Sequence, residues 1–145
     1  MSLLEIDREK MPKHIAVIMD GNGRWAKKRG MRREFGHRAG RKAVKKIVES
    51  CAELKIKNLT LYAFSTENWN RPKLEIDFLM QLLFLSLKDE LKNLNKNNIK
   101  FETIGNLNRL PKKIGNYLEK VKEETFLHFV VVYCCVELIY LRARG

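Results

Sequence analysis

The feature that most constrains the fold is a short apolar run, residues 15–19, that ends at an acidic residue and a glycine-rich loop. The run is rich in branched side chains, which is typical of a buried β-strand. Asp20 follows directly, and Gly21 and Gly23 then permit a tight turn and a close approach of a ligand to the backbone. The sequence therefore predicts a strand that presents one carboxylate beside a glycine turn.

Cationic side chains follow this turn closely, at Arg24, Lys27, Lys28 and Arg29. Such cations suit a phosphate-bearing ligand, because charged donors form strong hydrogen bonds with phosphate oxygens. A carboxylate among them is best explained by a hard divalent cation such as Mg²⁺, whose other positions phosphate oxygens would fill. The alternative is structural: a strand end, a glycine turn and a solvated basic helix, since short motifs often match by chance.

The composition fits a single domain, residues 1–145, that is large enough to bury a core. With 29 Lys and Arg against 17 Asp and Glu, the net charge of +12 favours an anionic partner: a diphosphate, a nucleic acid or an acidic membrane surface. No row of aromatic residues is interleaved with the basic ones, which argues against nucleic acid.

The cysteines and the apolar segments indicate a cytoplasmic location. Cys51, Cys134 and Cys135 are odd in number and lack zinc spacing, so neither a disulfide framework nor a structural metal is expected. Residues 1–13 are charged and contain no long apolar segment, so no signal peptide is expected. The apolar run at residues 126–140 is shorter than the ~20 residues that span a bilayer, and we interpret it as a buried strand.

Strand and helix patterns alternate along the chain. Residues 39–54 carry apolar side chains on one helical face, and residues 58–64 form a second predicted strand. Residues 100–104 and 127–134 are further predicted strands, separated by a short helix at residues 111–124. This alternation predicts an α/β fold in which a parallel β-sheet is covered by helices.

A longer predicted helix, residues 73–94, is apolar over much of its circumference. Such a helix is either buried on two sides or borders an internal apolar cavity. Core packing and a lipid tunnel explain the pattern equally well.

Polar clusters follow the first two predicted strands, at residues 20–24 and 65–71. In open parallel sheets, ligands bind beyond the carboxyl ends of the strands. We therefore expect the two clusters to converge on one site.

Three motifs in this order resemble those of the cis-prenyltransferases, the undecaprenyl diphosphate synthase family. They are HIAVIMDGNGRWA at residues 14–26, FGHRAG at residues 35–40 and LYAFSTENWNRP at residues 61–72. The resemblance implies the fold of that family and isoprenyl transferase activity: condensation of isopentenyl diphosphate with an allylic diphosphate in cis geometry, with undecaprenyl diphosphate as the default product.

The resemblance also implies roles for single residues. Asp20 would be the catalytic and metal-binding carboxylate, with Mg²⁺ offsetting charge on the departing diphosphate. Asn68 is implied in proton removal, although a neutral amide is a poor base and could instead position a water or a diphosphate oxygen. The other residues that the resemblance places against substrate are Gly21, Asn22, Gly23, Arg24, Trp25, Arg33, His37, Ser65, Thr66, Glu67, Trp69 and Arg71.

Structural alternatives stand beside several of these roles. His37 alone would be interpreted as a surface or capping histidine at the start of a helix, and His14 as structural. Trp25 could shield the allylic chain from water or fill the core. Glu67 and Glu75 belong to a segment that in the family moves over the site, but an ordinary strand-to-helix loop has the same polar composition.

The resemblance ends at about residue 124. Family members continue with an Asn-Tyr-Gly-Gly-Arg segment, an Arg-and-Ser motif for the second diphosphate and a metal-binding Glu, none of which this sequence contains. We interpret residues 125–145 as a divergent tail of a truncated or frame-shifted copy, which keeps the allylic-diphosphate half and loses the family's homodimer interface. The alternative to turnover is a non-catalytic fragment or partner subunit that binds allylic diphosphate. The product would bring a transferase to the membrane surface.

Overall fold

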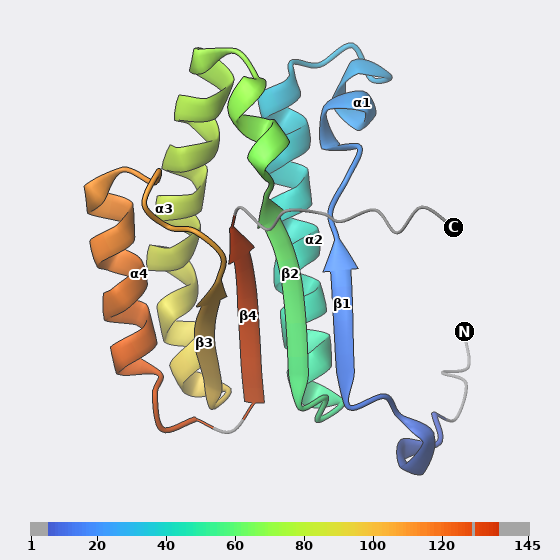
Figure 1. The fold of residues 1–145 in the computed structure, drawn as a ribbon. Coiled ribbons are helices and arrows are strands. Elements are labelled where there is room, and N and C mark those ends of the chain that lie inside the picture. The colour runs from blue at the N-terminus through green and yellow to red at the C-terminus, as the bar shows by residue number, and fades with distance from the viewer. Residues whose placement is uncertain (1–5, 129, 137–145) are drawn as a thin grey trace, which may run out of the picture.

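A computed structural model describes residues 6–128 and 130–136 of the chain. Within these residues the structure is a four-stranded, wholly parallel sheet with the strand order β1-β2-β4-β3 (Figure 1). The strands are β1 (His14–Ile18), β2 (Asn58–Phe64), β3 (Ile99–Ile104) and β4 (Val130–Val136). The prediction of an α/β fold with a parallel sheet is confirmed, and the predicted second strand has the observed bounds.

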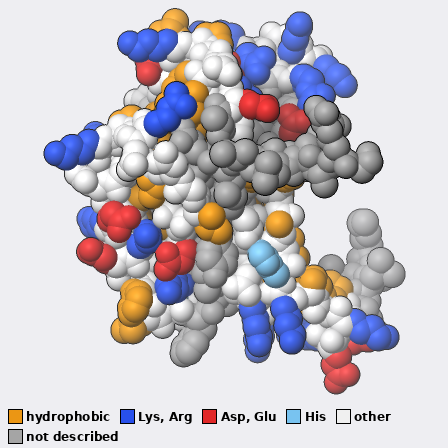
Figure 2. Space-filling view, viewed as in Figure 1, with side chains coloured by type: hydrophobic (Ala, Val, Ile, Leu, Met, Phe, Trp, Pro, Cys, Tyr) orange, Lys and Arg blue, Asp and Glu red, His pale blue; other side chains and the backbone are white. Residues whose placement is uncertain are grey.

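Helices connect the strands and, apart from the short first helix, pack on one side of the sheet (Figure 1). They are α1 (Asn22–Lys27), α2 (Arg33–Glu53), α3 (Lys73–Lys96) and α4 (Lys112–Glu124), with short 3-10 turns η1 (Arg8–Lys10) and η2 (Thr66–Asn70). No helix among the described residues is long and apolar enough to cross a bilayer. Figure 2 shows Lys and Arg side chains gathered over α1, at the upper right of the view.

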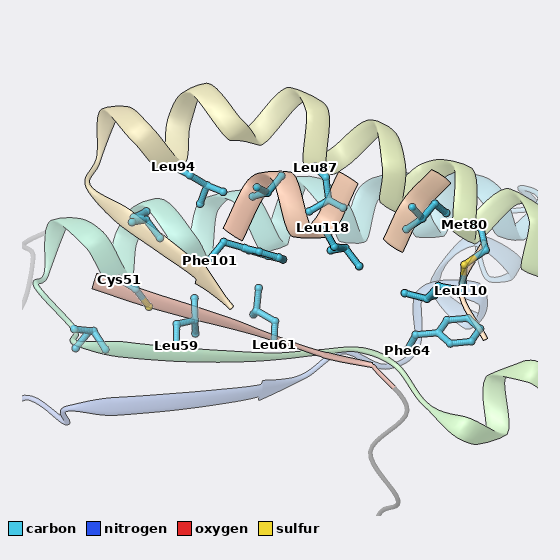
Figure 3. Packing of buried hydrophobic residues seen from close by; sticks show 14 residues of the cluster. Cys51, Leu59, Leu61, Phe64, Met80, Leu87, Leu94, Phe101, Leu110 and Leu118 are labelled. Carbon is cyan, nitrogen blue, oxygen red and sulfur yellow. The ribbon is translucent and has the colours of Figure 1, made fainter. Parts of the chain in front are cut away.

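The core lies between the sheet and the helices α2, α3 and α4. Leu59 and Leu61 of β2 point from the sheet toward Leu87 of α3 and Leu118 of α4 (Figure 3). Alternate residues of a strand face opposite sides of the sheet, which explains why Leu59 and Leu61 are buried while Thr60 between them is only half-buried. One face of the sheet therefore supplies the core.

The prediction that β1 is a fully buried strand is wrong. His14, Ala16 and Ile18 are exposed, and Ile18 keeps 63% of its surface, whereas Ile15 and Val17 are half-buried. β1 is an edge strand of the sheet, and the helices cover it on one side. A short run of branched apolar residues does not distinguish such a strand from one that is covered on both faces.

Helix α2 begins at Arg33, six residues before the predicted start at residue 39. The predicted start rested on the apolar spacing from residue 43 onward, and the first turns of the observed helix contain Gly36 and Gly40, which have low helix propensity. In the structure they serve the contact with α1, because a Cβ built on Gly36 would lie 1.9 Å from the backbone oxygen of Asn22. The early start places Arg33 and His37 on a helix, close to the loop after β1.

Candidate functional site

One cavity of about 310 Å³ joins the loop after β1, the segment after β2 and the facing sides of α2 and α3. Asp20 and Arg71, from the two predicted polar clusters, both line it. The clusters therefore converge on one site, as predicted. Polar lining residues are Asp20, Asn22, Arg24, Arg33, His37, Arg41, Lys45, Asn68, Arg71, Ser86 and Glu90, and apolar ones include Val44, Val48, Leu61, Leu79, Leu83, Leu87, Leu94 and Phe101.

The apolar part of this cavity bears on the two explanations of the broad apolar face of α3, core packing and a lipid tunnel. Met80, Leu87 and Leu94 are buried in the core and also line the cavity. Leu79, Leu82 and Leu83 on the same helix are half-buried and line it too. α3 thus contributes both to the core and to an internal apolar surface. Leu74 and Leu85, in contrast, are exposed.

Asp20 stands at the mouth of the cavity, fixed by its own loop. Its Oδ1 accepts a hydrogen bond from the Gly21 backbone N–H at 2.6 Å, and its Oδ2 accepts one from Arg24 Nη2 at 2.8 Å. Gly21 has a φ of +86°, a left-handed conformation that favours glycine, and the chain turns there into α1. The predicted glycine turn after the strand is therefore present.

The surroundings of Asp20 keep its carboxylate ionised. The hydrogen bond from Arg24 lowers the pKa of Asp20 most, followed by the bond from Gly21 and the charge of Arg24, and the charge of Arg71 adds to this. A carboxylate that is negative at neutral pH, in a cleft of cations, is a ligand of the kind that a hard metal ion prefers.

We predict that Arg24→Gln raises the pKa of Asp20 toward its ordinary value of 3.8. Because the native pKa lies below that value, the charged carboxylate contributes to stability above pH 3.8, and this contribution is lost as the pH falls through the native pKa. A ¹³C NMR titration of the Asp20 carboxyl measures the change directly. Lys27→Gln, one turn along α1, is the matched control and should leave the titration unchanged; equal curves for Arg24→Gln and the wild type would contradict the prediction.

Glu75, in the first turn of α3, accepts hydrogen bonds from three side chains that line the cavity, two arginines and one histidine. Its Oε1 accepts hydrogen bonds from Arg33 Nε at 3.2 Å, from His37 Nε2 at 3.1 Å and from Arg71 Nη1 at 3.1 Å. His37 is 8% exposed, so it is neither a surface histidine nor a cap. The sequence analysis did not include Glu75 among the substrate-binding residues. Its spacing of four residues from Arg71 could have indicated their contact, whereas nothing in the sequence indicates its contacts with α2.

Glycines bring α1 and α2 together at the site. A Cβ on Gly23 would lie 2.7 Å from the Arg33 guanidinium, and a Cβ on Gly40 would lie 2.4 Å from the side-chain amide of Asn22. Gly23 itself has no left-handed backbone. Glycine is therefore needed at position 23 because Arg33 approaches it closely, whereas it is needed at position 21 for the left-handed turn.

Asn68 lies in η2, at the cavity wall. Its Oδ1 accepts a hydrogen bond from the Ser65 backbone N–H at 3.0 Å. The side-chain oxygen is thus used to hold the turn, while the Nδ2 group is left as a hydrogen-bond donor. This geometry favours the positioning role for Asn68 over that of a base.

The structure does not place every predicted substrate residue in the cavity. Trp25 is 38% exposed beneath the Arg29 guanidinium, 4.1 Å from the ring centre, so it does not fill the core. Trp69 packs edge-on against Phe64, with ring centres 4.8 Å apart, and its buried Nε1 has no partner among the described residues. Ser65 and Glu67 also lie outside the lining, and the side chain of Thr66 is outside the described part of the chain.

The donor set fits a metal ion that shares its coordination with a ligand. Among the described residues, no three His, Cys, Asp or Glu side chains are grouped so that they could hold a metal. Mg²⁺, however, is commonly held by one or two carboxylates together with waters and substrate phosphates. Asp20, ionised and exposed at the cavity mouth, is suited to that arrangement.

Fold and site together define an α/β protein with a cationic cleft that continues into an apolar cavity. The family model of undecaprenyl diphosphate synthases matches residues 18–140 of this chain. The chain belongs to this family, as the three sequence motifs predicted.

Individual relatives agree with this assignment. An isoprenyl transferase from Fusobacterium nucleatum subsp. nucleatum is 53% identical over 117 residues, which cover 81% of this chain and 51% of the relative. A ditrans,polycis-undecaprenyl-diphosphate synthase ((2E,6E)-farnesyl-diphosphate specific) from Buchnera aphidicola subsp. Schizaphis graminum is 53% identical over 121 residues, 83% of this chain and 48% of the relative. The chain thus spans about half the length of the curated relatives it matches.

A solved structure confirms the fold. Lavandulyl diphosphate synthase from Lavandula x intermedia, in complex with dimethylallyl diphosphate, superposes with a TM-score of 0.82 at 32% sequence identity. The match covers 89% of this chain and 56% of that one. The described fold is therefore that of the corresponding part of a cis-prenyltransferase.

Proposed function

We propose that this chain binds an allylic diphosphate and takes part in its cis-condensation with isopentenyl diphosphate. The observation that supports this most directly is the continuity of one cavity, polar and cationic at Asp20, Arg33 and Arg71 and apolar between α2 and α3. An allylic diphosphate has the same two parts, a charged head and an apolar chain. Ligand sites are typically apolar cavities with a few well-placed polar groups.

The cationic mouth supports the position of the diphosphate. Arg33 uses its Nε and Arg71 its Nη1 to bind Glu75, so both guanidinium groups keep further N–H donors. Guanidinium groups can bind two phosphate oxygens at once, which a lysine cannot do. Arg24 would supply a third guanidinium when it releases the Asp20 carboxylate and binds a phosphate oxygen instead.

The size and lining of the apolar part support a short allylic chain. The whole cavity, with its polar mouth, has a volume of about 310 Å³, at the lower end of the range for ligand cavities, about 300–1,000 Å³. Val44 and Val48 of α2 face Leu79 and Leu83 of α3 across this space. Such a lining excludes water from the reacting carbon, which protects an allylic cation from capture by water.

In the reaction, the bond between the allylic carbon and the diphosphate breaks, a carbon–carbon bond forms with isopentenyl diphosphate, and one proton leaves the new chain. Asp20 would hold Mg²⁺, which offsets the charge on the departing diphosphate. Arg24, Arg33 and Arg71 would bind that group as its charge grows, and the Nδ2 group of Asn68 would orient a diphosphate oxygen or a water. The loss of the family's homodimer interface, a cytoplasmic location and an association with the membrane surface through the product stay predictions.

A chain-elongation assay tests this function. Purified chain is incubated with farnesyl diphosphate and radiolabelled isopentenyl diphosphate, with Mg²⁺ or with EDTA, and butanol-extractable label is counted. We expect Mg²⁺-dependent incorporation. Calorimetry with farnesyl diphosphate runs in parallel: binding without incorporation would select the non-catalytic alternative, and neither binding nor incorporation would refute the proposal.

A further inference from the structure

Glu75 is the most connected side chain of the site and has no assigned role. Its single oxygen Oε1 binds Arg33 and His37 of α2, 42 and 38 residues away in sequence, and Arg71 from the end of the η2 segment. The Glu75 side chain is 13% exposed, against 56% for Arg33 and 32% for Arg71. The carboxylate thus lies behind the two arginines, on the side away from solvent, and His37, at 8% exposed, is buried beside it.

We propose that Glu75 is a positioning residue that holds Arg33, His37 and Arg71 in the arrangement that receives a diphosphate. This inference rests on the proposed function and adds a residue to it. Glu75 does not reach the ligand in the proposal; it acts through the three side chains that it binds.

The chemistry of the contact fixes the hydrogen on the histidine. Burial raises the pKa of Glu75, but the hydrogen bond from His37 and the charges of Arg33 and Arg71 lower it, and the net shift is downward. The carboxylate is therefore ionised and can only accept hydrogen bonds. His37 must then carry a hydrogen on Nε2, and its Nδ1 takes no part in the contact with Glu75.

The same contact orients the two arginines. Each guanidinium gives one N–H to Glu75, Nε in Arg33 and Nη1 in Arg71, and keeps the rest of its planar set of donors. A guanidinium held at one edge loses less freedom when it binds a phosphate, because one of its orientations has already been selected. The negative charge also reduces repulsion between the two arginines in the empty cleft.

Other ion pairs between α2 and α3 lack these features. Arg41 binds Asp89, whose side chain is 62% exposed, and among the described residues this carboxylate forms an ion pair with Arg41 alone. Asp89 does not line the cavity. Asp89→Asn is therefore a control for the loss of one carboxylate charge from the same helix, because it leaves the contacts of Glu75 in place. It frees Arg41, which lines the cavity, so this variant should bind pyrophosphate at least as tightly as the wild type, the opposite of the effect expected for Glu75→Gln.

The experiment compares wild type, Glu75→Gln and Asp89→Asn with inorganic pyrophosphate as the probe. Glutamine keeps the size of Glu75 but removes its charge and cannot hold all three donors. If Glu75 positions the donors, Glu75→Gln binds pyrophosphate about tenfold more weakly, within the range measured for residues that orient ligand groups in other sites. If Glu75 merely opposes the anion electrostatically, Glu75→Gln binds more tightly, which would overturn the proposal.

A second readout needs no ligand. ¹⁵N NMR of the His37 ring should show hydrogen on Nε2 in the wild type and in Asp89→Asn, and a mixture of tautomers in Glu75→Gln. Unchanged His37 shifts in a folded Glu75→Gln variant, as judged by circular dichroism, would refute the positioning role. Failure of the wild type to bind pyrophosphate would count against the proposed function, while the ring shifts would still decide on Glu75.

Discussion

Asp20→Ala is expected to make pyrophosphate binding insensitive to Mg²⁺, whereas the wild type should bind at least about 100-fold more tightly with Mg²⁺ than without it. Residues that only orient metal ligands contribute 10–100-fold to metal affinity, so loss of the ligand itself should cost at least the upper value. The same substitution should abolish any Mg²⁺-dependent chain elongation. Calorimetric titrations with Mg²⁺ and with EDTA measure the effect.

The Asp20→Ala variant should also show an opposite effect in EDTA. Without the carboxylate, Arg24 loses its 2.8 Å partner and is free to bind the anion, and one negative charge is removed from the cavity mouth. Metal-free pyrophosphate should therefore bind the variant at least as tightly as the wild type. Asp7→Ala, at the N-cap of η1, is the control and should match the wild type in both buffers. Strong enhancement by Mg²⁺ that survives in Asp20→Ala would place the metal elsewhere.

Gly36→Ala should destabilise the fold by about 3 kcal/mol, the upper end of the usual cost of overpacking. The added Cβ would lie 1.9 Å from the backbone oxygen of Asn22 and 2.6 Å from its carbonyl carbon, and neither atom can move unless α1 moves. Displacement of α1 separates Asn22 and Arg24 from Arg33 and His37. Urea unfolding and pyrophosphate titration should therefore both show a loss.

Gly115→Ala is the matched control for this substitution. Gly115 lies within α4, and a Cβ there would meet nothing within 4 Å. Alanine is favoured over glycine inside a helix, so this variant should be more stable by about 0.5–1 kcal/mol, with unchanged pyrophosphate affinity. A Gly36→Ala protein as stable as the wild type would show that α1 and α2 can separate without cost.

The sequence predicted the class of fold and the meeting of the two loops because both follow from local patterns. Apolar runs that alternate with amphipathic helices predict a parallel sheet, and the strand ends then bring Asp20 and Arg71 to one edge. The strand order was not predictable in this way. β4 pairs with both β2 and β3, and nothing local in residues 130–136 specifies its neighbours.

The candidate site was predicted in part for the same reason. Asp20, Arg24 and Asn68 belong to contiguous motifs, which one sequence displays directly. The role of Glu75 depends on α2 and α3 lying against each other, which brings together residues 38 and 42 positions apart. Trp69, whose motif implies a contact with substrate, lies outside the cavity lining and packs against Phe64, and its role stays a prediction.

The position of β4 has a consequence for how the chain is made. β4 follows β1, β2 and β3 in the sequence, yet it lies between β2 and β3. Until residues 130–136 leave the ribosome, the β1-β2 pair and β3 are separate pieces with unpaired backbone edges, which are prone to pair with other chains. The nascent chain therefore stays vulnerable to aggregation until β4 has been made, and only then can β2 and β3 be joined in one sheet.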